Sequence, residues 1–243
     1  MKVTVIGYWG GYPEKGEATS CYLFQEKNFS LLVDSGSGAL ASLQNFINLK
    51  SLNCVVISHY HHDHIADIGV LQYYKIINAA NDGYALPIYG HGLDQDKFKT
   101  LTNKQATIGF EYNPNEILNL GPFAISFMKT NHPVDCYAMR IDTSDSAVVY
   151  TADSSYMEEF ISFSKDADLL ICDCNMYENQ DGTSAGHMNS KEVATIAQNA
   201  NVKQLLLSHL PHSGNTNHLL AEAEKYYNGL IQIAHTGFEW KSI

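Results

Sequence analysis

Four histidines and one aspartate lie within the eight residues ISHYHHDH, residues 57–64. His59 and His61 can project toward one point. Asp63 and His64 can turn toward a neighbouring point, so the spacing separates two nitrogen ligands from one oxygen and one nitrogen ligand. Two adjacent metal ions fit this division. Each pair alone is too small a shell for a tetrahedral zinc ion, so further ligands are required.

Candidates for the missing ligands stand at the ends of later strand-like segments. His132 lies in TNHPVD between two such segments. Asp153 lies in TADSS after residues 147–150, and His209 lies in LSHLPH after residues 204–207. Loops at strand ends let side chains converge without confining them to one face of a sheet. We therefore expect histidines and aspartates of this kind to complete the two shells.

Short apolar or alternating segments, broken by Gly, Pro, Asn or Asp, indicate a chain rich in β-strands. Helices are expected at residues 65–79, 190–200 and 219–227. The second has a capping-box pattern, with Asn189 at its cap and Glu192 three residues on. The expected strands are residues 2–8, 20–25, 29–33, 53–58, 88–89, 106–112, 123–129, 136–141, 147–151, 169–174 and 204–208.

Sheet-forming segments interspersed with amphipathic helices predict an α/β protein, with two sheets packed together and helices outside. The sequence contains no internal linker, low-complexity tract or short repeat. We therefore expect a single domain that spans residues 1–243. With 45% hydrophobic residues, a chain of this length can bury a sizeable core.

These motifs resemble the metallo-β-lactamase superfamily, whose signature HxHxDH appears at residues 59–64 and whose later motif residues follow in the family's order. The resemblance implies an αββα sandwich. It also implies two zinc ions per chain, with manganese as the alternative, and an early structural aspartate at Asp34 in LLVDSGSG. Its ligand pattern assigns one metal to His59, His61 and His132, the other to Asp63, His64 and His209, and the bridging position to Asp153.

Two branches of the superfamily match less well. Asp153 stands where many true β-lactamases carry cysteine or serine, and His61 stands where the oxygen-reducing diiron relatives carry glutamate. By contrast, GHMNSKEVATIAQNA, from Gly186, resembles the RNase Z branch, in which a histidine precedes a helix. His187 matches that histidine, which is thought to stabilise charge or protonate the departing oxygen at the scissile phosphate. A helix N-terminus beside it would favour an anion.

The resemblance thus implies a phosphodiesterase in which Asp63 receives a proton from the attacking water and His187 assists the leaving group. Residues 133–152 leave room only for a two-strand hairpin where tRNA-processing members carry a long gripping arm. A net charge of -11 also opposes extended contact with nucleic acid. The expected substrate is therefore a small phosphodiester or an RNA end, with nucleic acid not favoured.

Three alternative functions remain open. A lactonase or thioesterase would use the same metals on a carbonyl. His187 distinguishes this function from a phosphodiesterase, because an ester leaving group does not require the histidine. A tRNA 3′-processing endonuclease would need another surface to hold its substrate. A metal-binding regulatory protein without turnover is the third.

Composition also bears on the environment of the protein. The five cysteines are odd in number and scattered in strand-like segments, which is typical of reduced, buried thiols. No segment has the roughly 18 uncharged apolar residues that a membrane helix needs. We therefore expect a cytoplasmic protein without a membrane span. A homodimer is expected because relatives of the RNase Z branch commonly form one.

Overall fold

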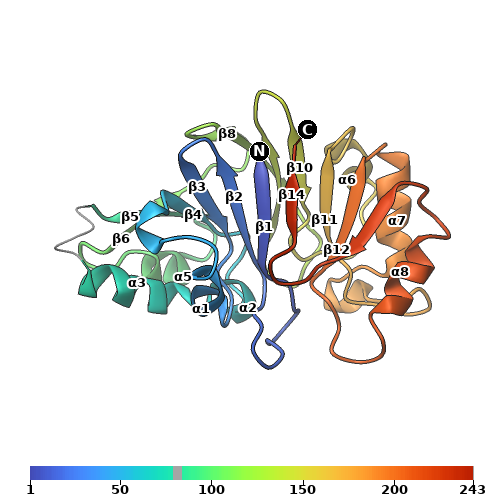
Figure 1. The fold of residues 1–243 in the computed structure, drawn as a ribbon, viewed down its shortest axis with the longest axis horizontal. Coiled ribbons are helices and arrows are strands. Elements are labelled where there is room, and N and C mark those ends of the chain that lie inside the picture. Colours follow the sequence, from blue (N-terminus) through green and yellow to red (C-terminus); the bar gives the residue numbers. More distant parts are fainter. Residues whose placement is uncertain (79–83, 243) are drawn as a thin grey trace. The chain divides into compact units, whose positions relative to one another are not determined.

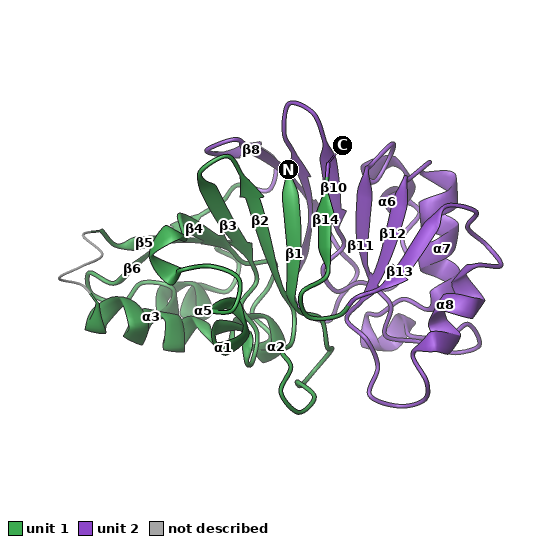
Figure 2. Ribbon diagram, viewed as in Figure 1, with its two compact units in different colours: residues 1–113, 235–241, 243 green, residues 114–234, 242 purple. Residues whose placement is uncertain are grey.

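The computed structural model describes residues 1–78 and 84–242, and these residues form two compact units (Figure 2). Unit 1 contains residues 1–113 and 235–241, and unit 2 contains residues 114–234 and 242. Each unit has one seven-stranded sheet and its own helices. The expectation of a single domain remains a prediction, and the units are described in turn.

The sheet of unit 1 has the strand order β14-β1-β2-β3-β4-β5-β6. β14 to β3 pair antiparallel, and β3 to β6 pair parallel. The last strand of the chain returns beside the first, so red β14 lies next to blue β1 in Figure 1. The strands are β1 (Lys2–Gly7), β2 (Cys21–Glu26), β3 (Phe29–Val33), β4 (Cys54–Val56), β5 (Leu86–Gly90), β6 (Thr107–Glu111) and β14 (Glu239–Lys241).

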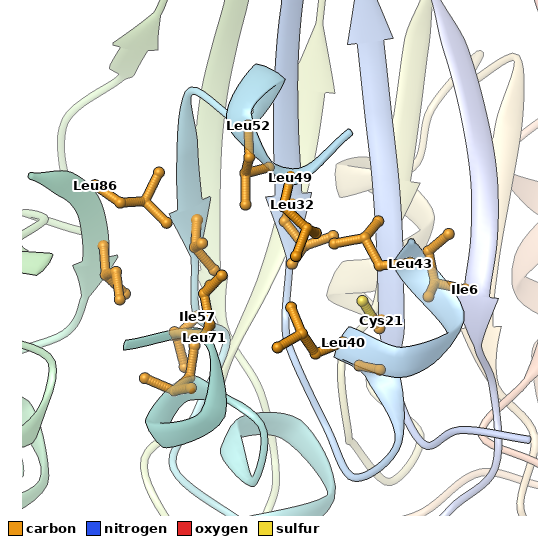
Figure 3. Close-up of a cluster of buried hydrophobic side chains, with 14 of the residues drawn as sticks. Ile6, Cys21, Leu32, Leu40, Leu43, Leu49, Leu52, Ile57, Leu71 and Leu86 are labelled. Atoms are coloured by element: carbon orange, nitrogen blue, oxygen red, sulfur yellow. The ribbon is translucent and has the colours of Figure 1, made fainter. Parts of the chain in front are cut away.

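The helices of unit 1 pack against its sheet through a hydrophobic cluster (Figure 3). The helical residues Leu43 and Leu71 share this cluster with Leu32 of β3 and with Ile57, which directly follows β4, and all four side chains are almost fully buried. Burying one such side chain stabilises a fold by about 1.5–3 kcal/mol. The helical elements are α1 (Ala39–Leu43), η1 (Leu49–Ser51), α2 (His62–Ile65), α3 (Ile68–Ile77) and α5 (Gln95–Thr100).

The helix expected at residues 65–79 is wrong in its bounds. A short helix, α2, already contains His62–Ile65, and α3 begins only at Ile68. Asp67 interrupts the helix because its N–H donates to the Ser35 carbonyl (3.0 Å) and its carboxylate accepts from the Leu40 N–H (2.8 Å). The predicted end of the helix, at residues 79–83, lies outside the described residues.

The sheet of unit 2 has the order β13-β12-β11-β10-β9-β8-β7, parallel from β10 to β13 and antiparallel from β7 to β10. Since β8 and β10 are both antiparallel to β9, the strands β8, β10, β11 and β12 end at the same edge. The loops after these strands therefore start side by side. The bounds are β7 (Leu118–Leu120), β8 (Phe123–Lys129), β9 (Tyr137–Asp142), β10 (Ala147–Tyr150), β11 (Leu169–Asp173), β12 (Gln204–Ser208) and β13 (Leu230–Ile233).

Helices α6 (Glu159–Phe163), α7 (Ser190–Asn199) and α8 (Asn217–Ala223) belong to unit 2, where α7 contacts β11 and β12. The predicted capping box is confirmed, because Asn189 accepts from the Glu192 N–H and the Glu192 carboxylate accepts from the Asn189 N–H. A 3₁₀ turn, η2 (Thr183–Ala185), precedes α7. The third predicted helix ends four residues early, and Tyr227 instead donates its hydroxyl to the Val202 carbonyl (2.6 Å).

Two further expectations are confirmed. β9 and β10 form the predicted hairpin between residues 132 and 153. All five cysteines are free and buried. Within the described ranges, no helix has the length and apolar character to cross a bilayer.

Candidate metal centre

In unit 1, the histidine signature follows β4 and continues into α2. His59 Nε2 lies 3.1 Å from His61 Nδ1, and the two rings meet edge to face. His64 Nε2 lies 3.6 Å from Asp63 Oδ2. His62, in the middle of the signature, is exposed. The signature therefore places its side chains in two pairs, one with two nitrogen atoms and the other with one nitrogen and one oxygen, the division that its spacing predicted.

Asp34, fully buried at the end of β3, holds this loop in place. Its Oδ1 accepts from the Ser58 N–H, and its Oδ2 accepts from the Ser58 hydroxyl and from His64 Nδ1, each at 2.8 Å. A carboxylate only accepts, so Nδ1 of His64 carries the proton and its Nε2 keeps a lone pair. Asp34 thus fixes both the position and the tautomer of His64.

The same chain of hydrogen bonds reaches His59. The Ser58 hydroxyl gives its proton to Asp34, so its oxygen is left to accept from His59 Nδ1, 3.1 Å away. This leaves the lone pair of His59 on Nε2, the atom that faces His61. A histidine that binds a metal commonly donates its other N–H in this way.

In unit 2, Asp153 lies between two histidines. Its Oδ2 is 3.3 Å from His209 Nε2 and 3.9 Å from His132 Nε2. Asp153 is 2% exposed, and the loop that carries it is tied to the loop of His132 because Thr130 donates its hydroxyl to the Asp153 carbonyl (2.8 Å). One carboxylate oxygen thus faces two imidazole nitrogens, a geometry that is compatible with a bridging ligand.

His132 is also fixed in one tautomer. Its Nδ1 lies 3.1 Å from the Gly186 carbonyl, which can only accept, so Nε2 keeps the lone pair. A Cβ on Gly186 would lie 2.6 Å from His132 Nδ1, and the backbone φ of +77° there also favours glycine. Burial lowers the pKa of His132 despite the Asp153 charge, which favours the neutral ring that binds metals.

Asp173, at the end of β11, is a site residue that the sequence analysis missed. Its Oδ2 accepts from His187 Nδ1 (2.8 Å), and its Oδ1 lies 3.4 Å from His209 Nδ1. Burial lowers the pKa of His187, but the charge of Asp173 and this hydrogen bond outweigh it and raise the pKa above its usual value. Residues 172–174 read as a buried strand, yet Asp173 stands at a strand end, the same signal that marked Asp153 and His209.

Three turns at strand ends place non-glycine residues in the left-handed backbone region. Asp34 follows β3 with φ 58°, Ala152 precedes Asp153 with φ 51°, and His209 follows β12 with φ 51°. This conformation costs roughly 1–2 kcal/mol for an L-residue and persists only where surrounding contacts enforce it. Each turn bends the chain just beyond its strand and so sets the direction of one candidate side chain, that of Asp34, Asp153 or His209.

The donor atoms fit a divalent metal ion. Two ligands at about 2.0–2.1 Å from one tetrahedral zinc ion lie about 3.3–3.4 Å apart. The pairs within each unit lie close to this separation, at 3.1 and 3.6 Å in unit 1 and 3.3 Å for His209 and Asp153 in unit 2. Histidine nitrogen and carboxylate oxygen also suit manganese, iron and cobalt, so the donor chemistry leaves the metal open.

The chain belongs to the beta-lactamase superfamily, because the model of the beta-lactamase superfamily domain matches residues 30–210. The predicted resemblance and the α/β metallo-β-lactamase fold are thereby confirmed. The probable metallo-hydrolase YhfI of Bacillus subtilis is 55% identical over 243 residues, which cover 99% of this chain and 100% of YhfI. The crystal structure of YhfI has a TM-score of 0.97 at 53% identity and covers 98% of both chains.

More distant proteins share the fold. The ribonuclease Z of Metallosphaera sedula is 23% identical over 277 residues, covering 93% of this chain and 94% of the ribonuclease. A diphosphatase of the PhnP family, known from its crystal structure, has a TM-score of 0.80 at 18% identity, covering 99% of this chain and 97% of the other. At that identity, the structural likeness shows the fold alone. The family match and the likeness to YhfI, together with the donor sets above, support a metallo-hydrolase of the metallo-β-lactamase fold.

Asp34→Asn should weaken zinc binding by about 10-fold to 100-fold, the usual effect of losing a partner that orients a ligand. The amide nitrogen cannot accept, so at least one donor among the Ser58 N–H, the Ser58 hydroxyl and His64 Nδ1 loses its acceptor. Competition with a chromophoric chelator measures the affinity. Asp96→Asn is the control, since this side chain is 96% exposed. Equal zinc affinities in the two variants would refute the role of Asp34.

Proposed function

We propose that this protein is a dinuclear, zinc-dependent phosphodiesterase that acts on a small phosphodiester or an RNA end. The observation that carries the proposal is the Asp173–His187 pair. The centroid of the His187 ring lies 5.0 Å from that of the His209 ring and 5.5 Å from that of the His132 ring. Its Nδ1 is hydrogen-bonded to Asp173. An imidazole whose Nδ1 is held by a buried carboxylate, and whose pKa is raised, thus lies beside candidate ligands in unit 2.

The ligand assignment proposed is the one that the resemblance implies. The pairs found within each unit support it, since the two signature pairs of unit 1 divide as two metals require. In unit 2, the carboxylate of Asp153 lies close to two histidines, and one of them is assigned to each metal. The proposed ligands are His59, His61 and His132 for one zinc ion, Asp63, His64 and His209 for the other, and Asp153 as the bridge.

Bound zinc ions would supply Lewis acidity, lowering the pKa of water toward neutrality and neutralising charge that develops on phosphate oxygens. The residues of the chain move the protons. Asp63 accepts a proton from the attacking water. His187 donates a proton from Nε2 to the departing oxygen, because Asp173 holds the other ring nitrogen and favours the charged ring.

The short β9–β10 connection and the net negative charge of the chain support the proposed substrate class. Residues 137–150 form only the β9–β10 hairpin, with a connection at residues 143–146, so this part of the chain carries no long arm. The net charge of -11 disfavours extended contact with a polyanion. Ribonuclease and diphosphatase, the activities named for two relatives, are both phosphoryl chemistry and support a phosphoester substrate.

His187→Ala should leave both zinc ions bound and slow phosphodiester cleavage by about 10²-fold to 10⁴-fold, the range for a positioned acid. The loss should be larger for an alkoxide leaving group than for p-nitrophenolate, which departs without a proton. Initial rates on bis-p-nitrophenyl phosphate, cyclic nucleotides, tRNA precursors and lactones provide the comparison. His218→Ala, exposed on α8, is the matched control.

Equal losses for good and poor leaving groups would show that His187 is not the acid. Unchanged phosphodiester rates, together with turnover of lactones, would replace the phosphodiesterase reading with the lactonase alternative.

Asp173→Asn should reduce turnover of the poor-leaving-group substrate, and its effect should vanish when His187 is already alanine. The reason is that Asp173 is proposed to act through the His187 ring, so the double variant should be no slower than His187→Ala alone. Rates of the two single variants and the double variant, each saturated with zinc, complete the cycle. Losses that multiply would mean that Asp173 acts by an independent route, such as its contact with His209.

A further inference from the structure

The loop that follows β1 makes direct contact with the signature aspartate. This loop, residues 8–17, will be called the β1 loop. The backbone N–H of Gly11 donates to Asp63 Oδ2 at 2.8 Å, although the two residues are 52 positions apart. Asp63 is 9% exposed, whereas Gly11 is exposed, so the contact is buried on the side of the carboxylate only. A charge-assisted hydrogen bond of this kind is stronger than one between neutral groups.

The conformation of Gly11 is the one that only glycine adopts readily. Its φ is +72°, and a Cβ built on it meets no atom within 4 Å. Space is therefore available for a side chain, and what restricts the position is the left-handed backbone. That backbone turn, completed by the Tyr12 N–H donating to the Gly10 carbonyl (2.8 Å), presents the Gly11 N–H to the carboxylate.

The base of the β1 loop is clamped by one carboxylate. Glu17 Oε2 accepts from the Tyr8 hydroxyl at 2.6 Å and from the Trp9 indole N–H. The backbone N–H groups of Tyr8 and Trp9 both donate to the Ala18 carbonyl, at 3.0 and 3.3 Å. Burial first, and then Glu17, raises the pKa of Tyr8, so its hydroxyl stays protonated as a donor. The two ends of the loop are thereby joined.

We propose that the β1 loop is a positioning element for Asp63, with the Gly11 N–H orienting the carboxylate and the Glu17 clamp holding Gly11. The inference rests on the proposed function in taking Asp63 as a metal ligand and proton acceptor. The N–H occupies a lone pair of Oδ2, which lies 3.6 Å from His64 Nε2. Rotation of the carboxylate away from His64 would break this hydrogen bond.

The direct test removes only the Gly11 N–H. Glycolic acid in place of Gly11 turns the preceding amide into an ester and adds no side chain. A synthetic peptide of residues 1–20 can be joined to a fragment that begins at the native Cys21, so no other residue changes. The same ester at Gly16, also at positive φ in this loop, is the matched control, and the all-amide ligated protein is the reference.

The ester at Gly11 should weaken the binding of one of two zinc ions by about 10-fold to 100-fold and leave the other unchanged. At saturating zinc, kcat should fall while KM stays the same, because the substrate itself is not contacted. The ester at Gly16 should match the reference protein in both zinc titrations and kinetics. Equal zinc affinities for the esters at Gly11 and Gly16 would overturn the proposal.

A recombinant variant gives an independent test if the ligated chains do not refold. Glu17→Ala should weaken the same zinc ion, whereas Glu14→Ala, which removes an equal charge from the same loop, should not. Equal zinc affinities in these variants would also overturn the proposal. A reference protein that binds two zinc ions but cleaves no phosphodiester would sink the proposed reaction, while the zinc titrations would still decide the role of the loop.

Discussion

A histidine binds a metal ion only through a neutral ring nitrogen that keeps its lone pair, and this requirement governs the local structure around the candidate ligands. His64 meets it through Asp34, and His132 through the Gly186 carbonyl. His59 meets it through Ser58, which is itself oriented by Asp34. In each case the Nδ1 proton is given to an oxygen. His187 follows the same rule with Asp173, although it is assigned to a proton transfer and not to a metal.

Several of the candidate site residues lie in or beside sharp turns at strand ends. Asp34 itself, Ala152 beside Asp153, and His209 adopt left-handed backbone conformations without being glycine. Such strain is tolerable because each turn is fixed on several sides. Asp34 accepts three hydrogen bonds, and the loop of Asp153 is tied to that of His132 through Thr130. Within each sheet, neighbouring parallel strands end at the same edge, so the turns of that unit begin close together.

The sequence predicted much of this arrangement because its strongest signals are local. The signature spacing predicted that the side chains of the signature form two pairs in unit 1, and the capping box predicted the start of α7. The contact between Gly11 and Asp63 could not be predicted, since no pattern links a glycine to a carboxylate 52 positions away. The left-handed turns at Asp34 and His209 could not be predicted either, because neither position carries the glycine that usually marks such a turn. Asp173 was missed for another reason, because flanking cysteines and apolar residues made it resemble part of a core strand, whereas its position at the strand end was the informative feature.

The central claim is that the seven proposed ligands bind two metal ions and that both are needed for turnover. Titration of the metal-free protein with zinc, with bound zinc and hydrolysis of bis-p-nitrophenyl phosphate followed on the same samples, tests this claim most directly. We expect two tight zinc equivalents per chain and a maximal rate reached only at the second. Saturation of both binding and rate at one equivalent would contradict it.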